Sequence, residues 1–311
     1  MSRWTFACVI LLLQAPAAVS LTRQGGAAVS KSLPMPEGLE ADVHFWEKVF
    51  SKYSPEQCVF HDKDNLDVIY VVKKIPGFTA AAQSRNIRRY LGAIRASLKY
   101  LGDGGTPRNL LERRIVAVTP PEARTPTDFR VAMDNVRCQR GVDLEPSFER
   151  ARRHVAMVRR VLVQLGLPGD LAHLPHLESG YHLGAYSRAG ARGLWQLMPA
   201  TARLQGLRVS RSVDQRLSAY KSTIAAAGLL KELYQMTRSW PLAITAYNYG
   251  PNGMARAIQQ WGDDYMTIRE KHRTRIFGFA ARNYYPSFLA VRNLAESEEG
   301  AADSDDDESH L

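Results

Sequence analysis

Glu178 is one of two acidic residues in the segment 165–213, and the other, Asp170, is explained as a helix cap. Glu178 instead follows His176-Leu177 on an apolar stretch and lies at a predicted helix end. An apolar environment raises the pKa of a carboxyl group because it disfavours the ionised form. A Glu that is partly protonated near neutral pH can act as a general acid. The alternative is an exposed Glu on a last helical turn.

Histidines near Glu178 raise a second possibility, a metal site. They are His173, His176 and His182. The H-E-x-x-H spacing of helical zinc sites is absent, and Pro175 disturbs the helix that would carry it. We therefore predict no metal and no cofactor.

Two further segments extend the pattern that begins at Glu178-Ser179. Ser187 follows and leads into residues 189–199, which read AGARGLWQLMP, and residues 246–250 read AYNYG. Each motif alone is weak, but the three in this order are specific. Together they resemble the catalytic domain of the lytic transglycosylases, which has a goose-lysozyme-like helical fold. The resemblance covers residues 145–295.

The upstream sequence extends this resemblance to the membrane-bound type D branch of the family. Phe45-Trp46, His61-Asp62 and residues 65–70 are similar there. That branch usually carries C-terminal LysM modules, and we expect this chain to lack them. Relatives also have Glu-Thr shortly before the C-terminal active-site tyrosine, where this sequence reads Ala280-Ala281. Tyr284-Tyr285 follows, so either tyrosine fits that role.

The resemblance implies cleavage, without water, of the bond between N-acetylmuramic acid and N-acetylglucosamine in peptidoglycan. The 6-hydroxyl of muramic acid attacks its own anomeric carbon and leaves a 1,6-anhydro end. The family's catalytic acid, which later acts as base, falls on Glu178. Family residues that bind or position the substrate fall on Ser179, Ser187, Gly193, Leu194, Gln196, Met198, Tyr247, Asn248 and Tyr284 or Tyr285.

A single carboxylate suits this chemistry, because substrate-assisted glycosidases replace the second one by the acetamido oxygen of the sugar. Asp214 is the nearest candidate for a second catalytic acid. Two alternatives keep the same fold: a lysozyme-type hydrolase that admits water, and a non-catalytic peptidoglycan-binding scaffold. The sequence does not separate the lyase from the lysozyme.

The elements that must position these residues are predicted to be helices. Apolar residues recur every three or four positions from Phe148 to Leu165, which predicts one continuous helix, and the same spacing predicts a helix that ends at Gly102. Residues 68–72 are the only β-prone run. We predict a mainly all-α fold, with a helical N-terminal module that holds at most one short β element. The chain divides into a signal peptide (1–20), a linker (21–40), the N-terminal module (41–143), the catalytic domain (144–295) and a disordered acidic tail (296–311).

The N-terminus and the cysteines indicate the compartment. Arg3, the apolar run 6–13 and the small residues that follow are typical of a secretory signal peptide. Cys8 lies inside that run rather than after it, so we expect no lipid anchor and a periplasmic or secreted protein. No apolar run reaches the ~18–20 residues that a membrane span needs, so we also expect no transmembrane helix. Cys58 and Cys138 then form either one disulfide or two separate buried thiols.

The charge of the chain is unevenly distributed. Residues 1–295 hold all 41 Lys and Arg but only 23 of the 31 Asp and Glu, a net charge of +18, while eight acids lie in 296–311. A basic protein favours an anionic partner, which could be nucleic acid, a membrane surface or a cell-wall polymer. No Lys/Arg-rich recognition motif is present and export removes the chain from nucleic acid. We therefore expect a monomer whose partner is the glycan strand of peptidoglycan, which carries carboxylates.

Overall fold

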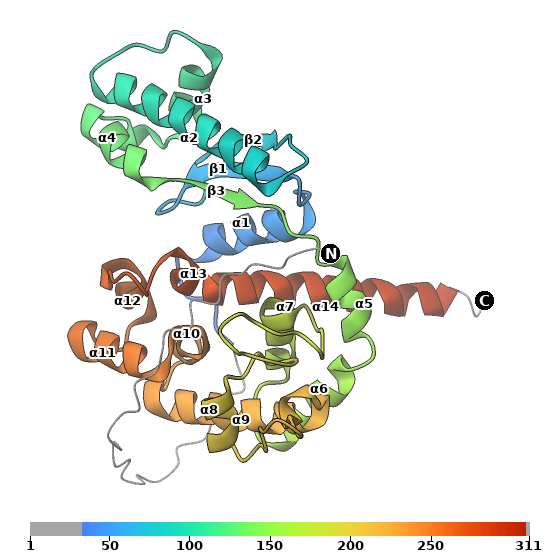
Figure 1. The fold of residues 1–311 in the computed structure, drawn as a ribbon. Coiled ribbons are helices and arrows are strands. Elements are labelled where there is room, and N and C mark those ends of the chain that lie inside the picture. The colour runs from blue at the N-terminus through green and yellow to red at the C-terminus, as the bar shows by residue number, and fades with distance from the viewer. Residues whose placement is uncertain (1–32, 309–311) are drawn as a thin grey trace. The chain divides into compact units, whose positions relative to one another are not determined.

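A computed structural model describes residues 33–308, with side chains through residue 298. The predicted signal peptide, residues 1–20, lies outside the described residues. The chain divides into two units, one of residues Gly38–Leu144 and one of residues 33–37 together with the chain from Glu145 onward. The predicted mainly all-α class is confirmed (Figure 1).

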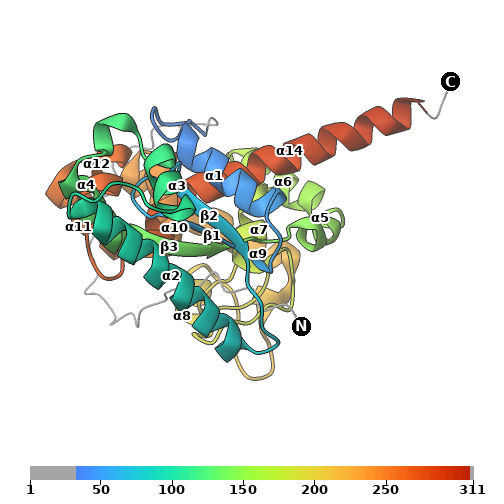
Figure 2. The ribbon, with the colours of Figure 1, turned by 90° about the horizontal axis from the view of Figure 1, so that it is seen from above.

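The unit Gly38–Leu144 combines helices with a small antiparallel sheet whose strand order is β2-β1-β3. Figures 1 and 2 show the long helix α2 lying across this sheet. Its elements are α1 (Glu40–Ser51), β1 (Gln57–Asp62), β2 (Ile69–Lys74), α2 (Ala80–Gly102), α3 (Leu110–Val118), the 3₁₀ turn η1 (Pro121–Ala123), α4 (Pro126–Asn135) and β3 (Val136–Arg140).

The sheet corrects the prediction of at most one short β element. The predicted run 68–72 forms most of β2, but β1 and β3 were not predicted. Strand β1 is buried along nearly its whole length, so it lacks the alternation that marks a half-exposed strand. Strand β3 reads VRCQR and owes its conformation to its pairing with β1, a contact distant in sequence.

Cys58 and Cys138 form a disulfide between β1 and β3, with Cα atoms 5.7 Å apart. The bond lies at the edge of an apolar core between the sheet and the helices α2, α3 and α4. Helix α2 contributes Ile94 and Leu98 to that core and ends at Gly102, as its spacing predicts. Burying each large aliphatic side chain contributes roughly 1.5–3 kcal/mol.

The second unit is helical. Helix α9 packs against α6 and α10, and α14 packs against α7, η2 and α10. Its elements are α5 (Glu145–Ala151), α6 (Val155–Gln164), η2 (Gly169–His173), α7 (Leu174–Ser179), α8 (Pro199–Leu204), η3 (Gln215–Leu217), α9 (Ala219–Thr237), α10 (Trp240–Tyr249), α11 (Pro251–Trp261), α12 (Tyr265–Lys271), α13 (Phe279–Arg282) and α14 (Tyr284–Glu308).

The single helix predicted across Phe148 to Leu165 is two helices in the structure, α5 and α6, separated by residues 152–154. The backbone N–H of His154 donates to the carbonyl of Ala151 at 2.8 Å, which closes a tight turn. Apolar spacing continues across this turn, so periodicity alone does not detect it. The break redirects the chain and brings Glu149, Arg150, Arg153 and His154 to the wall of one pocket.

The two ends of this unit also differ from the prediction. Helix α14 continues through residues 296–308, where the sequence predicts a disordered tail, and Figure 2 shows its C-terminal part projecting away from its unit. A helix already fixed by packed residues 284–291 extends at little cost, and Ala and Glu favour it. Within the predicted linker 21–40, Leu33 is buried and the carbonyl of Pro34 accepts a hydrogen bond from Tyr285. Among residues 33–308, no helix is long and apolar enough to cross a bilayer.

Candidate active site

Glu178 lies at the C-terminal end of α7, one residue before the helix closes at Ser179. Gly180 caps α7 in the left-handed conformation, and Tyr181 is also left-handed, with φ of 57°. A left-handed residue other than Gly costs roughly 1–3 kcal/mol and persists where packing enforces it. Tyr181 is only 1% exposed and its hydroxyl donates to the carbonyl of Ala172 at 2.6 Å. The turn after Glu178 is therefore rigid.

Glu178 is half-buried, and its carboxyl accepts a hydrogen bond from a tyrosine. Burial raises the pKa of Glu178 from its ordinary value of 4.5 to about 7. The hydroxyl of Tyr284 donates a hydrogen bond to Oε1 of Glu178, which favours the ionised form and lowers the pKa in the opposite direction. Burial outweighs the hydrogen bond, so Glu178 is about half protonated at neutral pH.

The structure distinguishes the two tyrosines that the sequence left equivalent. Tyr284, 5% exposed, reaches Glu178 from the start of α14. Tyr285 is fully buried, and its hydroxyl donates to the carbonyl of Pro34 at 2.6 Å. Successive residues on a helix point about 100° apart. Only Tyr284 therefore belongs to the Glu178 site, and Tyr285 lies elsewhere.

Hydrogen bonds tie α7 to the turn 193–196. Ser179 Oγ donates to the carbonyl of Leu194 at 2.8 Å, and Leu194 is fully buried. The hydroxyl of Tyr247, on α10, donates to the carbonyl of Trp195 at 2.7 Å. Trp195 is itself buried and donates from Nε1 to Thr223 at 3.0 Å. Trp195 is thus a core residue, and Ser179 and Tyr247 fix the turn from two helices.

Ser187 and Gln196 shape the loop that runs between α7 and α8. Ser187 Oγ accepts the backbone N–H of Ala191 at 2.9 Å, and the backbone N–H of Ser187 donates to the carbonyl of Ala191 at 2.9 Å. A hydroxyl that accepts one bond still has its own hydrogen to donate. Gln196 is left-handed, with φ of 47°, and its Nε2 donates to the carbonyl of Gly193 at 2.9 Å.

A buried arginine that the sequence analysis did not identify donates hydrogen bonds to backbone carbonyls of this loop. Arg216, 5% exposed, donates from Nη1 to the carbonyls of Gly190 and Leu197 at 2.8 and 2.9 Å. Its backbone carbonyl approaches Gly193 so closely that a Cβ there would lie 2.0 Å away. Gly193 therefore serves close packing. No sequence signal marks Arg216, because its partners are backbone carbonyls.

Asp214, the candidate second acid, binds the same arginine, Arg216. Its carboxylate accepts hydrogen bonds from Arg216 at 2.8 and 2.9 Å and from Arg192 at 3.2 Å. The hydrogen bonds from Arg216 hold the pKa of Asp214 below its ordinary value. Asp214 is therefore a structural ion-pair partner of two arginines.

The remaining predicted residues lie near the loop or in the core. Met198 precedes α8 and Asn248 lies in the last turn of α10, both half-buried.

His173 and His176 are each 1% exposed, and burial lowers their pKa, that of His173 to about 3. Nδ1 of His176 lies 2.7 Å from Ser147 Oγ. Within residues 33–308, no three His, Cys, Asp or Glu side chains gather as a metal site would require. The residue that precedes η2 is Pro168, and Asp170 lies within the first turn of η2, so Asp170 is not the capping residue that the sequence predicts.

This arrangement can deliver a proton. A carboxyl whose pKa is about 7 is partly protonated at neutral pH, and it can accept a proton again once ionised. The hydrogen bond from Tyr284 holds one oxygen, and the rigid turn at Gly180-Tyr181 fixes the backbone beside it. The site therefore combines one general acid–base group with a loop of fixed geometry.

Comparisons with known proteins match the same region. The chain is 33% identical over 154 residues to the membrane-bound lytic murein transglycosylase D of Escherichia coli (strain K12), covering 48% of this chain and 32% of that protein. It is 34% identical over 110 residues to a protein of Alteromonas sp. (strain M-1) named for tributyltin chloride resistance, covering 35% of this chain and 53% of that protein. The chain thus spans about a third of the length of the first relative and about half of the second.

A family match locates the domain within the chain. Residues 167–266 match the family described as the transglycosylase SLT domain, which confirms the resemblance drawn from the three motifs. The match includes Glu178 and Ser187, and also Tyr247 on α10. Residues 167–266, about a third of this chain, are therefore similar to the transglycosylase SLT domain.

Proposed function

We propose that this protein is a lytic transglycosylase that cleaves peptidoglycan between N-acetylmuramic acid and N-acetylglucosamine. The observation that carries the proposal is Glu178, whose pKa burial raises to about 7 beside the hydroxyl of Tyr284. The transglycosylase SLT match and the lytic murein transglycosylase among its relatives support the substrate. The export signal predicted from the sequence fits a polymer that lies outside the cytoplasm.

The proposed reaction uses Glu178 twice. Protonated Glu178 first gives its proton to the glycosidic oxygen, and the bond from that oxygen to the anomeric carbon of muramic acid breaks. The acetamido oxygen of the same sugar stabilises the positive charge that develops at this carbon. The ionised Glu178 then takes the proton of the 6-hydroxyl, whose oxygen bonds to the anomeric carbon. After the reaction the Glu178 carboxyl is protonated again, as it was at the start, and no water is consumed.

In this proposal the other residues position the substrate and the Glu178 carboxyl. Ser187 retains a hydroxyl hydrogen with which to hold the N-acetyl group, while Arg216 fixes the loop that presents it. Tyr284 keeps the Glu178 carboxyl in one orientation. Asp214 is engaged by Arg216, so a mechanism with a single carboxylate fits the site better than one with two.

The test is to incubate the purified protein with peptidoglycan and to measure the masses of released fragments. We expect anhydro ends, which are lighter by one water than reducing ends, and their loss in Glu178→Gln. The control is Glu270→Gln, an exposed carboxyl on α12. Reducing ends would make the protein a lysozyme-type hydrolase instead, and retained binding without any product would make it a scaffold.

A further inference from the structure

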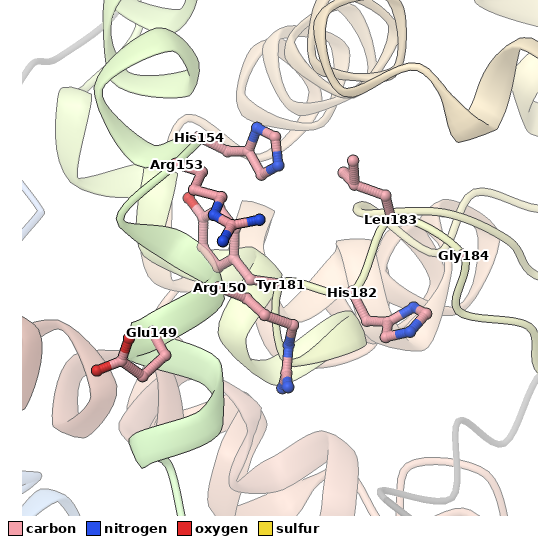
Figure 3. Close-up of a pocket in the computed structure, with 8 residues that line it drawn as sticks. All are labelled: Glu149, Arg150, Arg153, His154, Tyr181, His182, Leu183 and Gly184. Carbon is pink, nitrogen blue, oxygen red and sulfur yellow. The ribbon is translucent and has the colours of Figure 1, made fainter.

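The second unit contains a pocket that does not include Glu178. It has a volume of about 410 Å³ and lies between the turn after α5 and the segment that follows α7 (Figure 3). The end of α5 supplies Glu149 and Arg150, the turn after it supplies Arg153 and His154, and the other wall is formed by residues 181–184. The helix break at residues 152–154 creates the first wall.

The lining of this pocket is basic. Arg150, Arg153, His154 and His182 supply four basic side chains, and Glu149 is the one acid among the lining residues. Glu149 forms an ion pair at 3.0 Å with Arg152, which is not a lining residue. In Figure 3 the Glu149 carboxylate lies at the edge of the view, apart from the imidazoles of His154 and His182. The pocket therefore attracts anions.

Arg150 is oriented before any ligand binds. Its Nε donates to the carbonyl of Gly180 at 2.7 Å, and its side chain is half-buried. This bond leaves both terminal guanidinium nitrogens without a partner among the described residues. A guanidinium whose fork is already fixed loses little freedom when it binds a carboxylate through two parallel hydrogen bonds.

The pocket also has an apolar wall. The ring of Tyr181 is almost fully buried and held by its bond to Ala172, and Leu183 stands beside it. Gly184 approaches His182 closely, since a Cβ there would lie 3.1 Å from His182 Cε1. A ligand that suits this lining combines a carboxylate with aliphatic groups, as a short peptide does.

The pocket is connected to the Glu178 site by the backbone. Gly180, which anchors Arg150, caps the helix that carries Glu178, and residues 181–184 continue toward Ser187. If Glu178 acts on muramic acid, as proposed above, the substrate carries a peptide on the lactyl group of that same sugar. We propose that this pocket binds a carboxylate of the peptidoglycan side-chain peptide, so that the domain prefers peptide-bearing glycan to bare glycan. This inference rests on the proposed function.

Arg153 is the position at which to test the pocket. It is exposed and lines the pocket, whereas replacing Arg150 would also release Gly180 and disturb α7. The matched control is Arg160→Gln, which removes the same charge from an exposed position on α6 outside the pocket. All variants carry Glu178→Gln so that the probes are not cut. The probes are a soluble disaccharide-tetrapeptide from peptidoglycan and the same disaccharide without peptide, with affinities measured by calorimetry.

We expect Arg153→Gln to weaken binding of the peptide-bearing fragment about tenfold, the loss of one charge-assisted hydrogen bond, and to leave the peptide-free fragment unchanged. Arg153→Lys should recover part of the loss, and Arg160→Gln should change neither affinity. Equal affinities for both fragments, or no effect of Arg153→Gln, would overturn the inference while leaving cleavage by the wild type intact. Arg153-dependent binding of inorganic phosphate without a peptide preference would also overturn it, in favour of a general anion site. If the wild type neither cleaves peptidoglycan nor binds either fragment, the proposed function itself fails.

Discussion

Replacing Glu178 by Gln should stabilise the protein at alkaline pH, in addition to abolishing cleavage. Burial raises the pKa of Glu178 from 4.5 to about 7, so the folded state holds this proton more firmly than the unfolded state. Stability associated with the protonated carboxyl is therefore present below pH 4.5 and is lost as pH rises toward and through 7. A shift of about 2.5 units at 1.36 kcal/mol each makes the loss about 3 kcal/mol once the group is fully ionised. Gln cannot ionise and avoids this cost.

The measurement is urea or thermal unfolding of both proteins between pH 5 and pH 8. The stability of the variant minus that of the wild type should grow by about 2.5 kcal/mol over this range, which is roughly 5–10 °C in Tm. Other titrating groups are common to both proteins and cancel in the difference. Glu270→Gln measures the general effect of removing a negative charge from a basic protein. A difference between variant and wild type that does not change with pH would refute the reasoning.

Three further results are expected. Tyr284→Phe removes the hydrogen bond that lowers the pKa of Glu178, so the alkaline fall of the cleavage rate should move to higher pH. Tyr285→Phe should instead cost about 1–2 kcal/mol of stability and leave the pH dependence of the cleavage rate unchanged. Gly193→Ala should cost roughly 1–3 kcal/mol more than Gly190→Ala in denaturant unfolding, because both positions have positive φ but only the first approaches a backbone oxygen. Reducing the disulfide, whose cysteines are 80 residues apart, should cost the unit Gly38–Leu144 roughly 2–5 kcal/mol, measured by unfolding with and without reductant; an unchanged midpoint would contradict this.

The sequence was most informative where residue type and local order decide the chemistry. Glu178 could be singled out because few acids surround it, and the three motifs predicted the family that the comparison bears out. Its raised pKa could only be expected, because burial depends on residues distant in the chain, with Tyr284 more than a hundred positions away. Both tyrosines are buried, and the choice between them depends on which face of α14 is turned toward Glu178, which the order of the two residues does not reveal.

Non-local contacts account for what the sequence could not predict. Strand β3 pairs with β1 across the whole of α2, α3 and α4, and its own residues show little β pattern. The clamp around Arg216 is made largely of backbone carbonyls, which every sequence supplies equally. The turn at residues 152–154 leaves the apolar spacing intact, so it is visible only in three dimensions.

The hydrogen bond from Tyr285 to Pro34 sets an order for folding during synthesis. Its two residues are 251 positions apart, with the whole of Gly38–Leu144 between them. The intervening unit has all its strands and its disulfide within its own segment, so it can fold while the rest of the chain is still being made. The unit that contains Glu178 completes this contact only when its last helix emerges and meets residues 33–37, which are made before the intervening unit. A truncated chain that begins at Glu145 would lack that first segment and leave the Tyr285 hydroxyl without its partner.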